Sequence, residues 1–120
     1  MISKIIVIIL LGVFFLSGCG GFKERRIEKI QSEYPHWDQA TIEKVAVRKV
    51  EIGMTEEMVL AALGKPDAVS DEGNGKKWGY AIRVEHGWNF WYEYVYFVYF
   101  RDGKVATTAG DWSRLGYWYY

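Results

Sequence analysis

The stretch FWYEYVYFVYFRDGKVATTA, from Phe90 to Ala109, decides the fold of this chain of 120 residues. It is rich in the aromatic and β-branched residues that favour strands. Asp102-Gly103, near its middle, is typical of a two-residue hairpin turn. The sequence therefore predicts a long strand from Phe90 to Arg101 that turns into another strand from Lys104 to about Ala109.

This turn also predicts which side chains share a face of the sheet, because side chains alternate along a strand. One face of the long strand is expected to pack on helices, and it carries Phe90, Tyr92, Tyr94, Tyr96, Val98 and Phe100. The other face carries Trp91, Glu93, Val95, Phe97, Tyr99 and Arg101, with Ala106 and Thr108 as its neighbours on the next strand. We predict an aromatic surface on this second face, with Trp91, Phe97, Tyr99 and Arg101 as candidate partner-binding residues. Either the C-terminal residues 117–120 or a partner would cover it.

Upstream segments predict one further strand and two helices. A strand with alternating apolar residues runs from about Lys77 to Val84, after a polar loop at 71–75. Asp38 and Thr55 are good N-caps for the two helices, and Gly64 ends the second. We therefore predict an α+β domain in which two helices precede a three-stranded antiparallel meander (ααβββ) and pack on one sheet face.

The N-terminus has the form of an export signal. Lys4 precedes an apolar run from Ile5 to Leu16, which is shorter than the roughly 20 residues that span a membrane. The following Leu16-Ser17-Gly18-Cys19 resembles the lipobox of bacterial lipoproteins. The resemblance implies cleavage between Gly18 and Cys19, with diacylglycerol and an N-acyl chain on Cys19. The competing interpretation is an ordinary core cysteine.

These features divide the chain into three expected parts. Residues 1–18 would be the lipoprotein signal peptide, residues 19–35 the lipid anchor and tether, and residues 36–120 the αα-βββ domain. The segment 23–33 is dense in charge, with Ile27, Ile30 and Tyr34 at helical spacing. It is either a solvated tether or a helix.

Catalytic chemistry finds little support in the sequence. His36 and His86 lie far apart and match no metal-ligand spacing. None of the serines has nucleophile-elbow glycines around it. We therefore expect no enzyme, no metal and no cofactor other than the acyl chains. The 15 basic and 15 acidic residues balance, so no nucleic-acid partner is predicted either.

Several short motifs, taken in order, resemble one family. They are Gly53-Met54-Thr55, Leu63-Gly64 with Pro66, Trp78-Gly79-Tyr80, and the stretch from Tyr99 to Val105. In this order they are similar to the SmpA/OmlA (BamE-like) family of small outer-membrane lipoproteins, over about Ile52 to Ala109. The resemblance implies a non-catalytic ααβββ lipoprotein on the periplasmic face of the outer membrane, where it contacts barrel-assembly subunits and phospholipid. Gly20 after the cysteine also favours the outer membrane, since an aspartate there is associated with inner-membrane retention.

Two functional hypotheses follow. The first is a structural accessory factor of outer-membrane protein assembly or envelope integrity. The second is a binding module for a peptide or glycan, or an inhibitor of another protein, that uses the aromatic sheet face. The chain departs from the family pattern in its short 85–89 loop and its more aromatic long strand.

Overall fold

A computed structural model describes residues 21–116, so the predicted signal peptide at 1–18 with its cleavage site at Gly18 and Cys19, together with Gly20 and residues 117–120, lies outside the described part. The elements in chain order are α2 (Phe22–Glu33), α3 (Gln39–Ala46), α4 (Glu56–Leu63), β1 (Ala68–Glu72), β2 (Gly75–His86), β3 (Asn89–Arg101), β4 (Lys104–Gly110) and the 3-10 helix η1 (Trp112–Leu115). The α+β class is confirmed. The described part contains three α-helices and four strands, however, where two and three were predicted.

The strands form one antiparallel sheet in the order β1-β2-β3-β4. The strand that the prediction missed is β1. The predicted polar loop at 71–75 is shorter in the structure, where Gly73 and Asn74 alone form the turn between β1 and β2. All five β1 residues are exposed, so the strand has no buried face and no apolar alternation that would reveal it.

Both predicted helix caps are confirmed. The carboxylate of Asp38 accepts a hydrogen bond from the backbone N–H of Thr41 at 2.9 Å, at the start of α3. The hydroxyl of Thr55 accepts one from the N–H of Met58 at 3.3 Å, at the start of α4. Gly64 ends α4 with a φ of 83°, a conformation in which a side chain would be strained.

The segment Phe22–Glu33 is a helix, so the helical alternative for residues 23–33 is the one observed. Ile30 on α2 is buried and Ile27 is partly buried against the core. Arg26 donates through Nε to the carbonyl oxygen of Ala46 at 2.8 Å, at the last residue of α3. These contacts join α2 to the rest of the fold.

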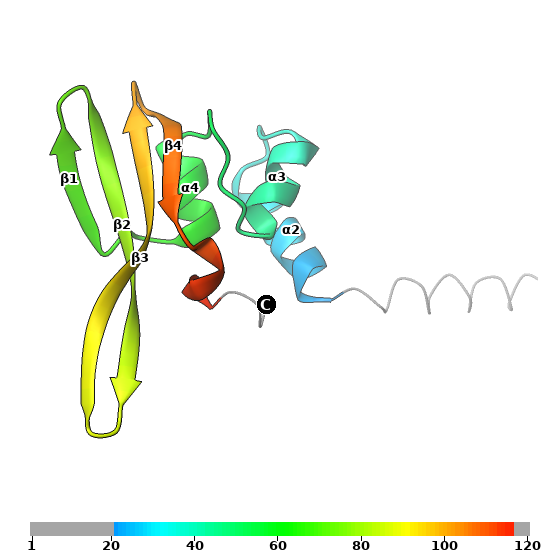
Figure 1. Cartoon of the computed structure of the whole chain (residues 1–120). Coiled ribbons are helices and arrows are strands. Elements are labelled where there is room, and N and C mark those ends of the chain that lie inside the picture. Colours follow the sequence, from blue (N-terminus) through cyan, green and yellow to red (C-terminus); the bar gives the residue numbers. More distant parts are fainter. Residues whose placement is uncertain (1–20, 117–120) are drawn as a thin grey trace, which may run out of the picture.

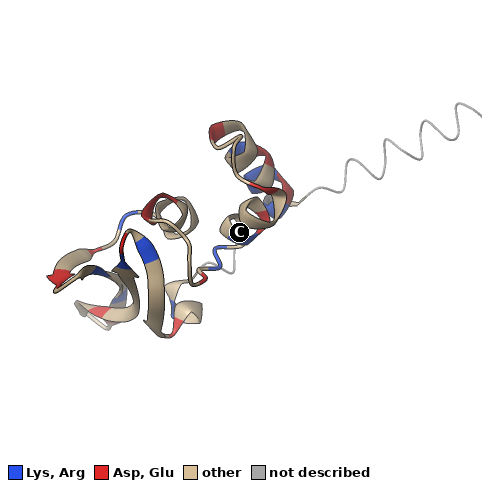
Figure 2. Ribbon diagram, turned by 90° about the horizontal axis from the view of Figure 1, so that it is seen from above, with Lys and Arg blue, Asp and Glu red and all other residues tan. Residues whose placement is uncertain are grey.

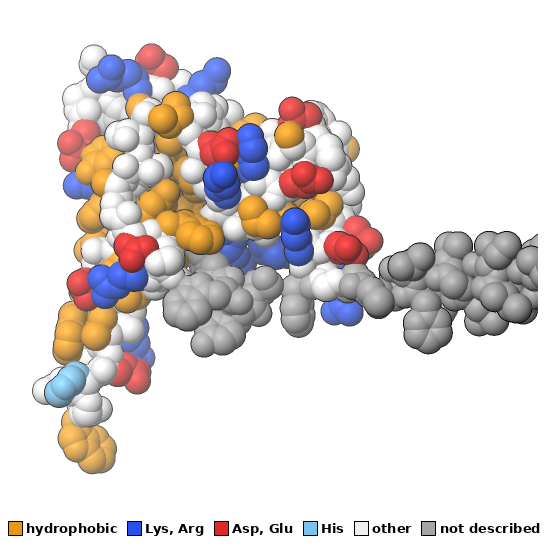
Figure 3. All heavy atoms as spheres, turned by 45° about the vertical axis from the view of Figure 1, so that its right-hand side comes forward, with side chains coloured by type: hydrophobic (Ala, Val, Ile, Leu, Met, Phe, Trp, Pro, Cys, Tyr) orange, Lys and Arg blue, Asp and Glu red, His pale blue; other side chains and the backbone are white. Residues whose placement is uncertain are grey.

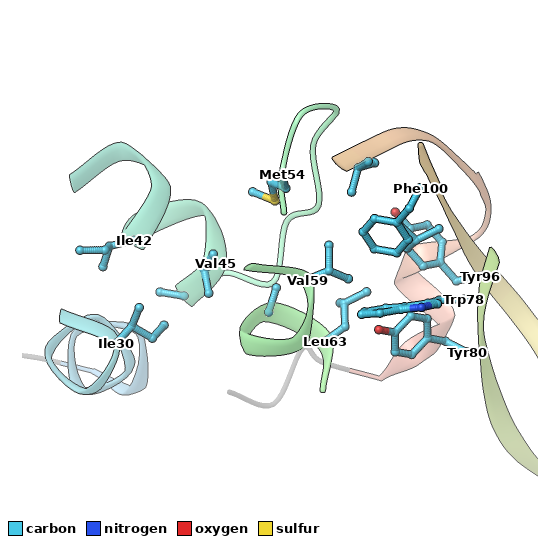
Figure 4. Close-up of a cluster of buried hydrophobic side chains, with 14 of the residues drawn as sticks. Ile30, Ile42, Val45, Met54, Val59, Leu63, Trp78, Tyr80, Tyr96 and Phe100 are labelled. Carbon is cyan, nitrogen blue, oxygen red and sulfur yellow. The ribbon is translucent and has the colours of Figure 1, made fainter. Parts of the chain in front are cut away.

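The helices cover one sheet face in two layers (Figure 1). Figure 4 shows Val59 and Leu63 of α4 between the sheet residues and Val45 of α3, with Ile30 of α2 farther out. The helix α4 therefore packs directly on the sheet, and α2 with α3 packs behind it. The buried core spans both layers and consists of Ile30, Ile42, Val45, Ala46, Met54, Val59, Ala62, Leu63, Trp78, Tyr80, Val95, Tyr96, Val98, Phe100 and Val105.

A β-bulge interrupts β3. Tyr80 pairs with Tyr96, but the next residue of β2, Ala81, pairs with Tyr94, so Val95 is an extra residue. Val95 and Tyr96 are consequently both buried. Side chains before the bulge are shifted to the opposite face from the one that strict alternation predicts.

A second bulge lies in β4. Tyr99 pairs with Thr107 and Phe100 with Val105, which leaves Ala106 unpaired. The β4 neighbours of the aromatic surface are therefore Thr107 and Ala109, and the prediction of Ala106 and Thr108 was wrong.

The β2–β3 hairpin projects beyond the other strands (Figure 1). In the described residues, β1 pairs with β2 only as far as Gly79, and β4 pairs with β3 only as far as Tyr96. The remainder of β2 and β3 is thus a two-stranded ribbon, which turns at Gly87 and Trp88. Among the described helices, none is long and apolar enough to cross a membrane.

Candidate functional site

The sheet face turned away from the helices carries a cluster of aromatic side chains. Trp78, Val98 and Phe100 are buried on the helix side, so their neighbours along β2 and β3 point the other way. We call the surface formed by Lys77 and Gly79 on β2 and by Tyr94, Phe97 and Tyr99 on β3 the aromatic face. Tyr94 is 47 % exposed, while Phe97 and Tyr99 are half-buried.

Two rings of the aromatic face, those of Tyr94 and Phe97, pack against Gly79. Tyr94 and Phe97 stack with their centroids 6.1 Å apart and their planes at 21°. A Cβ atom at Gly79 would approach the Tyr94 ring to 3.0 Å and the Phe97 ring to 3.4 Å. The missing side chain at Gly79 therefore leaves the space that these rings occupy.

A shallow hollow of about 220 Å³ accompanies the rings. It is lined by Ala68, Ser70, Lys77, Gly79, Tyr94 and Phe97. Small-molecule pockets usually measure about 300–1,000 Å³, so this hollow is better matched to one side chain of a larger partner. Its walls are small residues on β1, Gly79 and Lys77 on β2, and large rings on β3.

Lys77 provides the positive charge of the aromatic face. Its Nζ lies 4.6 Å from the ring centroid of Phe97 and 5.5 Å from that of Tyr99. Both distances are within the range of a cation–π contact. Elsewhere Lys and Arg are interspersed with Asp and Glu, and neither sign gathers on one element (Figure 2).

Residues 40–110 match the family model described as the outer membrane protein assembly factor BamE domain. The chain belongs to the BamE domain family. The match runs from the first turn of α3 to the last residue of β4, and so includes the whole aromatic face. Proteins of the BamE family are outer-membrane associated assembly factors and not enzymes. A comparison with curated proteins gave no match.

Within this BamE domain, the structure brings together two of the four candidate partner-binding residues and leaves a third at the margin. Phe97 and Tyr99 lie on the aromatic face, and Arg101 is exposed at its end beside the β3–β4 turn. Trp91 was wrongly placed: it pairs with Val84 on the opposite side, because the bulge at Val95 shifts the alternation. Whether these residues bind a partner stays a prediction.

Sequence reasoning missed Tyr94, which it assigned to the helix side. A bulge of the kind at Val95 has no clear signal in a run of aromatic and β-branched residues, since every residue of the run suits a strand. The small residue Gly79 was the available hint, because its missing side chain allows a ring to lie over it.

The described end of the chain lies on the helix side of the domain. Leu115 of η1 packs against the core, and Arg114 pairs with Glu93 at 3.3 Å. The backbone N–H of Asp111 donates to the carbonyl oxygen of Val95 at 2.8 Å. Up to Gly116, therefore, the tail does not cover the aromatic face, and residues 117–120 lie outside the described part.

The two histidines and the ion-paired carboxylate Glu51 of this BamE domain lie in different places in the described part. No group of three metal-ligating side chains occurs there. His36 makes edge-to-face contacts with Tyr34 and Trp37, while His86 lies at the far end of the hairpin. A hydrogen bond from Lys44, whose Nζ lies 2.8 Å from the carboxylate, lowers the pKa of Glu51. This ion pair joins the end of α3 to the loop that follows and serves the fold.

Proposed function

We propose that the protein is a lipid-anchored, non-catalytic accessory factor of outer-membrane protein assembly that binds a protein partner through its aromatic face. Membership of the BamE domain family carries the first part of this proposal. The aromatic face, which lies within the matched residues and is not covered by any part of the chain up to Gly116, supports the second part.

The physical character of the aromatic face suits a protein partner. Tyrosine and phenylalanine rings bury a large area at low entropic cost, which makes them frequent anchors in interfaces. The hollow beside Gly79 can accept one side chain of the partner. Lys77, over the rings, can meet an acidic residue there without losing its contact with Phe97.

The lipobox-like stretch ending at Cys19 would hold the domain on the membrane. One acyl chain binds a bilayer only reversibly, whereas several chains on one cysteine bind stably. The helix α2 begins at Phe22, so few residues would separate the anchor from the folded domain. The domain would therefore act close to the periplasmic surface of the outer membrane, with barrel-assembly subunits as its candidate partners.

A cross-linked pull-down of the tagged full-length protein from solubilised membranes, read by mass spectrometry, tests this function. We expect barrel-assembly subunits to be recovered, and to be lost for Phe97→Asp. A matched control is Val69→Asp, which places the same charge on an exposed valine of β1, on the other side of the sheet. A Cys19→Ala variant tests the anchor and is expected to lose recovery as well.

Recovery of the lipoprotein alone would refute a stable assembly complex. It would favour instead the binding-module hypothesis, in which the stacked rings of Tyr94 and Phe97 hold a peptide or a glycan. Equal loss of partners from Phe97→Asp and Val69→Asp would refute the aromatic face as the interface.

A further inference from the structure

The projecting end of the β2–β3 hairpin exposes an unusual amount of aromatic surface. We call residues 83–92 the hairpin tip. Within it, Trp88 is 103 % exposed, Tyr92 65 %, Phe90 54 % and Trp91 49 %. Hydrophobic side chains gather along this projection in Figure 3. A dense apolar patch on an exposed projection is typical of a site that binds another protein or a membrane.

These aromatic side chains point to both sides of the ribbon. Phe90 and Tyr92 pair with Glu85 and Arg83 and lie on the side of the aromatic face. Trp91 pairs with Val84 on the other side, and Trp88 sits in the turn between the strands. A protein surface docked on one side would leave the other in water. A medium that surrounds the tip contacts both sides.

The interfacial layer of a lipid bilayer is such a medium. Tryptophan and tyrosine are enriched there because their rings combine an apolar body with a polar group. All four exposed rings lie within five consecutive residues, 88–92. The tip therefore has both the composition and the shape of an interfacial anchor.

The backbone limits how deeply the tip can enter. Within residues 83–92 of the described structure, each strand pairs only with the other, so the outward N–H and C=O groups on both edges have no partner strand. Such groups need water or headgroups and cannot enter the hydrocarbon layer. Insertion at headgroup level satisfies them.

The charges of the tip are already paired. The Nε of Arg83 lies 3.1 Å from the carboxylate of Glu85, and the guanidinium sits 4.1 Å from the ring centroid of Phe90. The tip therefore offers no excess of positive charge to anionic lipids. Its attachment should depend little on salt or on anionic lipid.

We propose that the hairpin tip inserts into the headgroup region of a phospholipid bilayer and orients the domain on the membrane. The tip and the start of α2 lie toward the same end of the molecule, the lower end in Figure 1. One bilayer could therefore contact the tip and hold the chain that leads into α2. This contact does not depend on the protein partner proposed for the aromatic face, which leaves that face free to bind.

Site-specific fluorescence of the full-length protein tests the proposal. The variant His86→Cys places an environment-sensitive label in the tip, and Asn74→Cys places the same label at the β1–β2 turn, at the opposite end of β2. Both positions are exposed. The unsubstituted protein, treated with the same reagent, gives the background from Cys19.

We expect the label at position 86 to shift its emission to the blue on reconstitution into phosphatidylcholine vesicles. Headgroup-level spin-labelled lipid should quench this label and leave the label at position 74 unchanged. Added phosphatidylglycerol or salt should change neither result. Adding Trp88→Ser and Trp91→Ser to the His86→Cys protein should remove most of the quenching and preserve thermal unfolding, since both rings are exposed.

Equal behaviour of the two labels would overturn the proposal, and so would quenching that persists after both tryptophans are replaced. Quenching that appears only with phosphatidylglycerol would overturn the interfacial mechanism in favour of charge-driven binding. None of these outcomes depends on the recovery of assembly subunits. The failure of this inference is therefore distinguishable from the failure of the proposed function.

Discussion

Adjacent residues of β3 offer the sharpest test of the exposed aromatic face. Phe97 is half-buried on the aromatic face, whereas Val98 is 0 % exposed on the helix side. We predict that Phe97→Asp leaves the domain folded and that Val98→Asp unfolds it. The two substitutions introduce the same carboxylate one residue apart on the same strand, so only the side of the sheet differs.

The expected magnitudes follow from burial. Full burial of a phenylalanine contributes about 1.5–3 kcal/mol, so the half-buried Phe97 contributes roughly half of that. The lower strand preference of aspartate adds up to about 1 kcal/mol. Phe97→Asp should therefore destabilise the domain by about 2 kcal/mol, which lowers Tm by roughly 10–15 °C in a domain of this size. Its carboxylate reaches water and lies near Lys77.

Val98→Asp loses a similar apolar contribution and also buries a charge. Burial of an ion without a partner costs several kcal/mol. The sum approaches the entire stability of a small domain, which is about 5–15 kcal/mol.

Thermal unfolding of both variants, followed by circular dichroism, checks this prediction. We expect a cooperative transition at reduced Tm for Phe97→Asp and no folded baseline for Val98→Asp. If Phe97→Asp were as unstable as Val98→Asp, a part of the chain would cover Phe97. The aromatic face would then be core, and its role in binding would be refuted.

Three further predictions concern the fold. Thr55→Ala should destabilise the domain by about 1 kcal/mol in urea unfolding because it removes the cap of α4, and Thr55→Ser should retain most of that stability. Gly110→Ala should lower Tm more than Gly116→Ala: both glycines have positive φ, but only at Gly110 would a methyl group collide with the carbonyl oxygen of Val95. Hydrogen bonds from Thr41 lower the pKa of Asp38 below its ordinary 3.8, so its contribution to stability is complete above that pH and disappears as the pH falls through the folded-state pKa. Urea unfolding at a series of pH values should show this loss, and Asp38→Asn should flatten the curve below pH 3.8.

The elements that the sequence predicted correctly are those specified by local chemistry. The helix ends are set by hydrogen bonds within three residues, as at Asp38 and Thr55. The β3–β4 turn at Asp102-Gly103 has positive φ at both residues, which this dipeptide accepts most readily. Such features need no knowledge of distant contacts.

The elements that it missed or left open depend on distant partners. The strand β1 is exposed along its whole length and exists because it pairs with β2. The helix α2 is rich in charge, and packing of Ile30 and the hydrogen bond from Arg26 to Ala46 attach it to the core. Short helices are marginal in isolation, so its sequence alone left a solvated tether as an open alternative.

The bulge at Val95 explains why the predicted site divided into two surfaces. Strict alternation would place Trp91 with Phe97 and Tyr99 in one continuous row. With one extra residue in β3, Tyr94 joins Phe97 over Gly79, while Trp91 turns to the other side of the ribbon. The aromatic face is therefore compact and lies on one side of the sheet, which suits a protein interface. The hairpin tip carries aromatic rings on both sides, which suits insertion among lipid headgroups. A single backbone irregularity thus allows one strand to serve two contacts of different chemistry. If replacing Gly110 disturbs the bulge, it should therefore impair both contacts together, whereas Phe97→Asp should impair only the first.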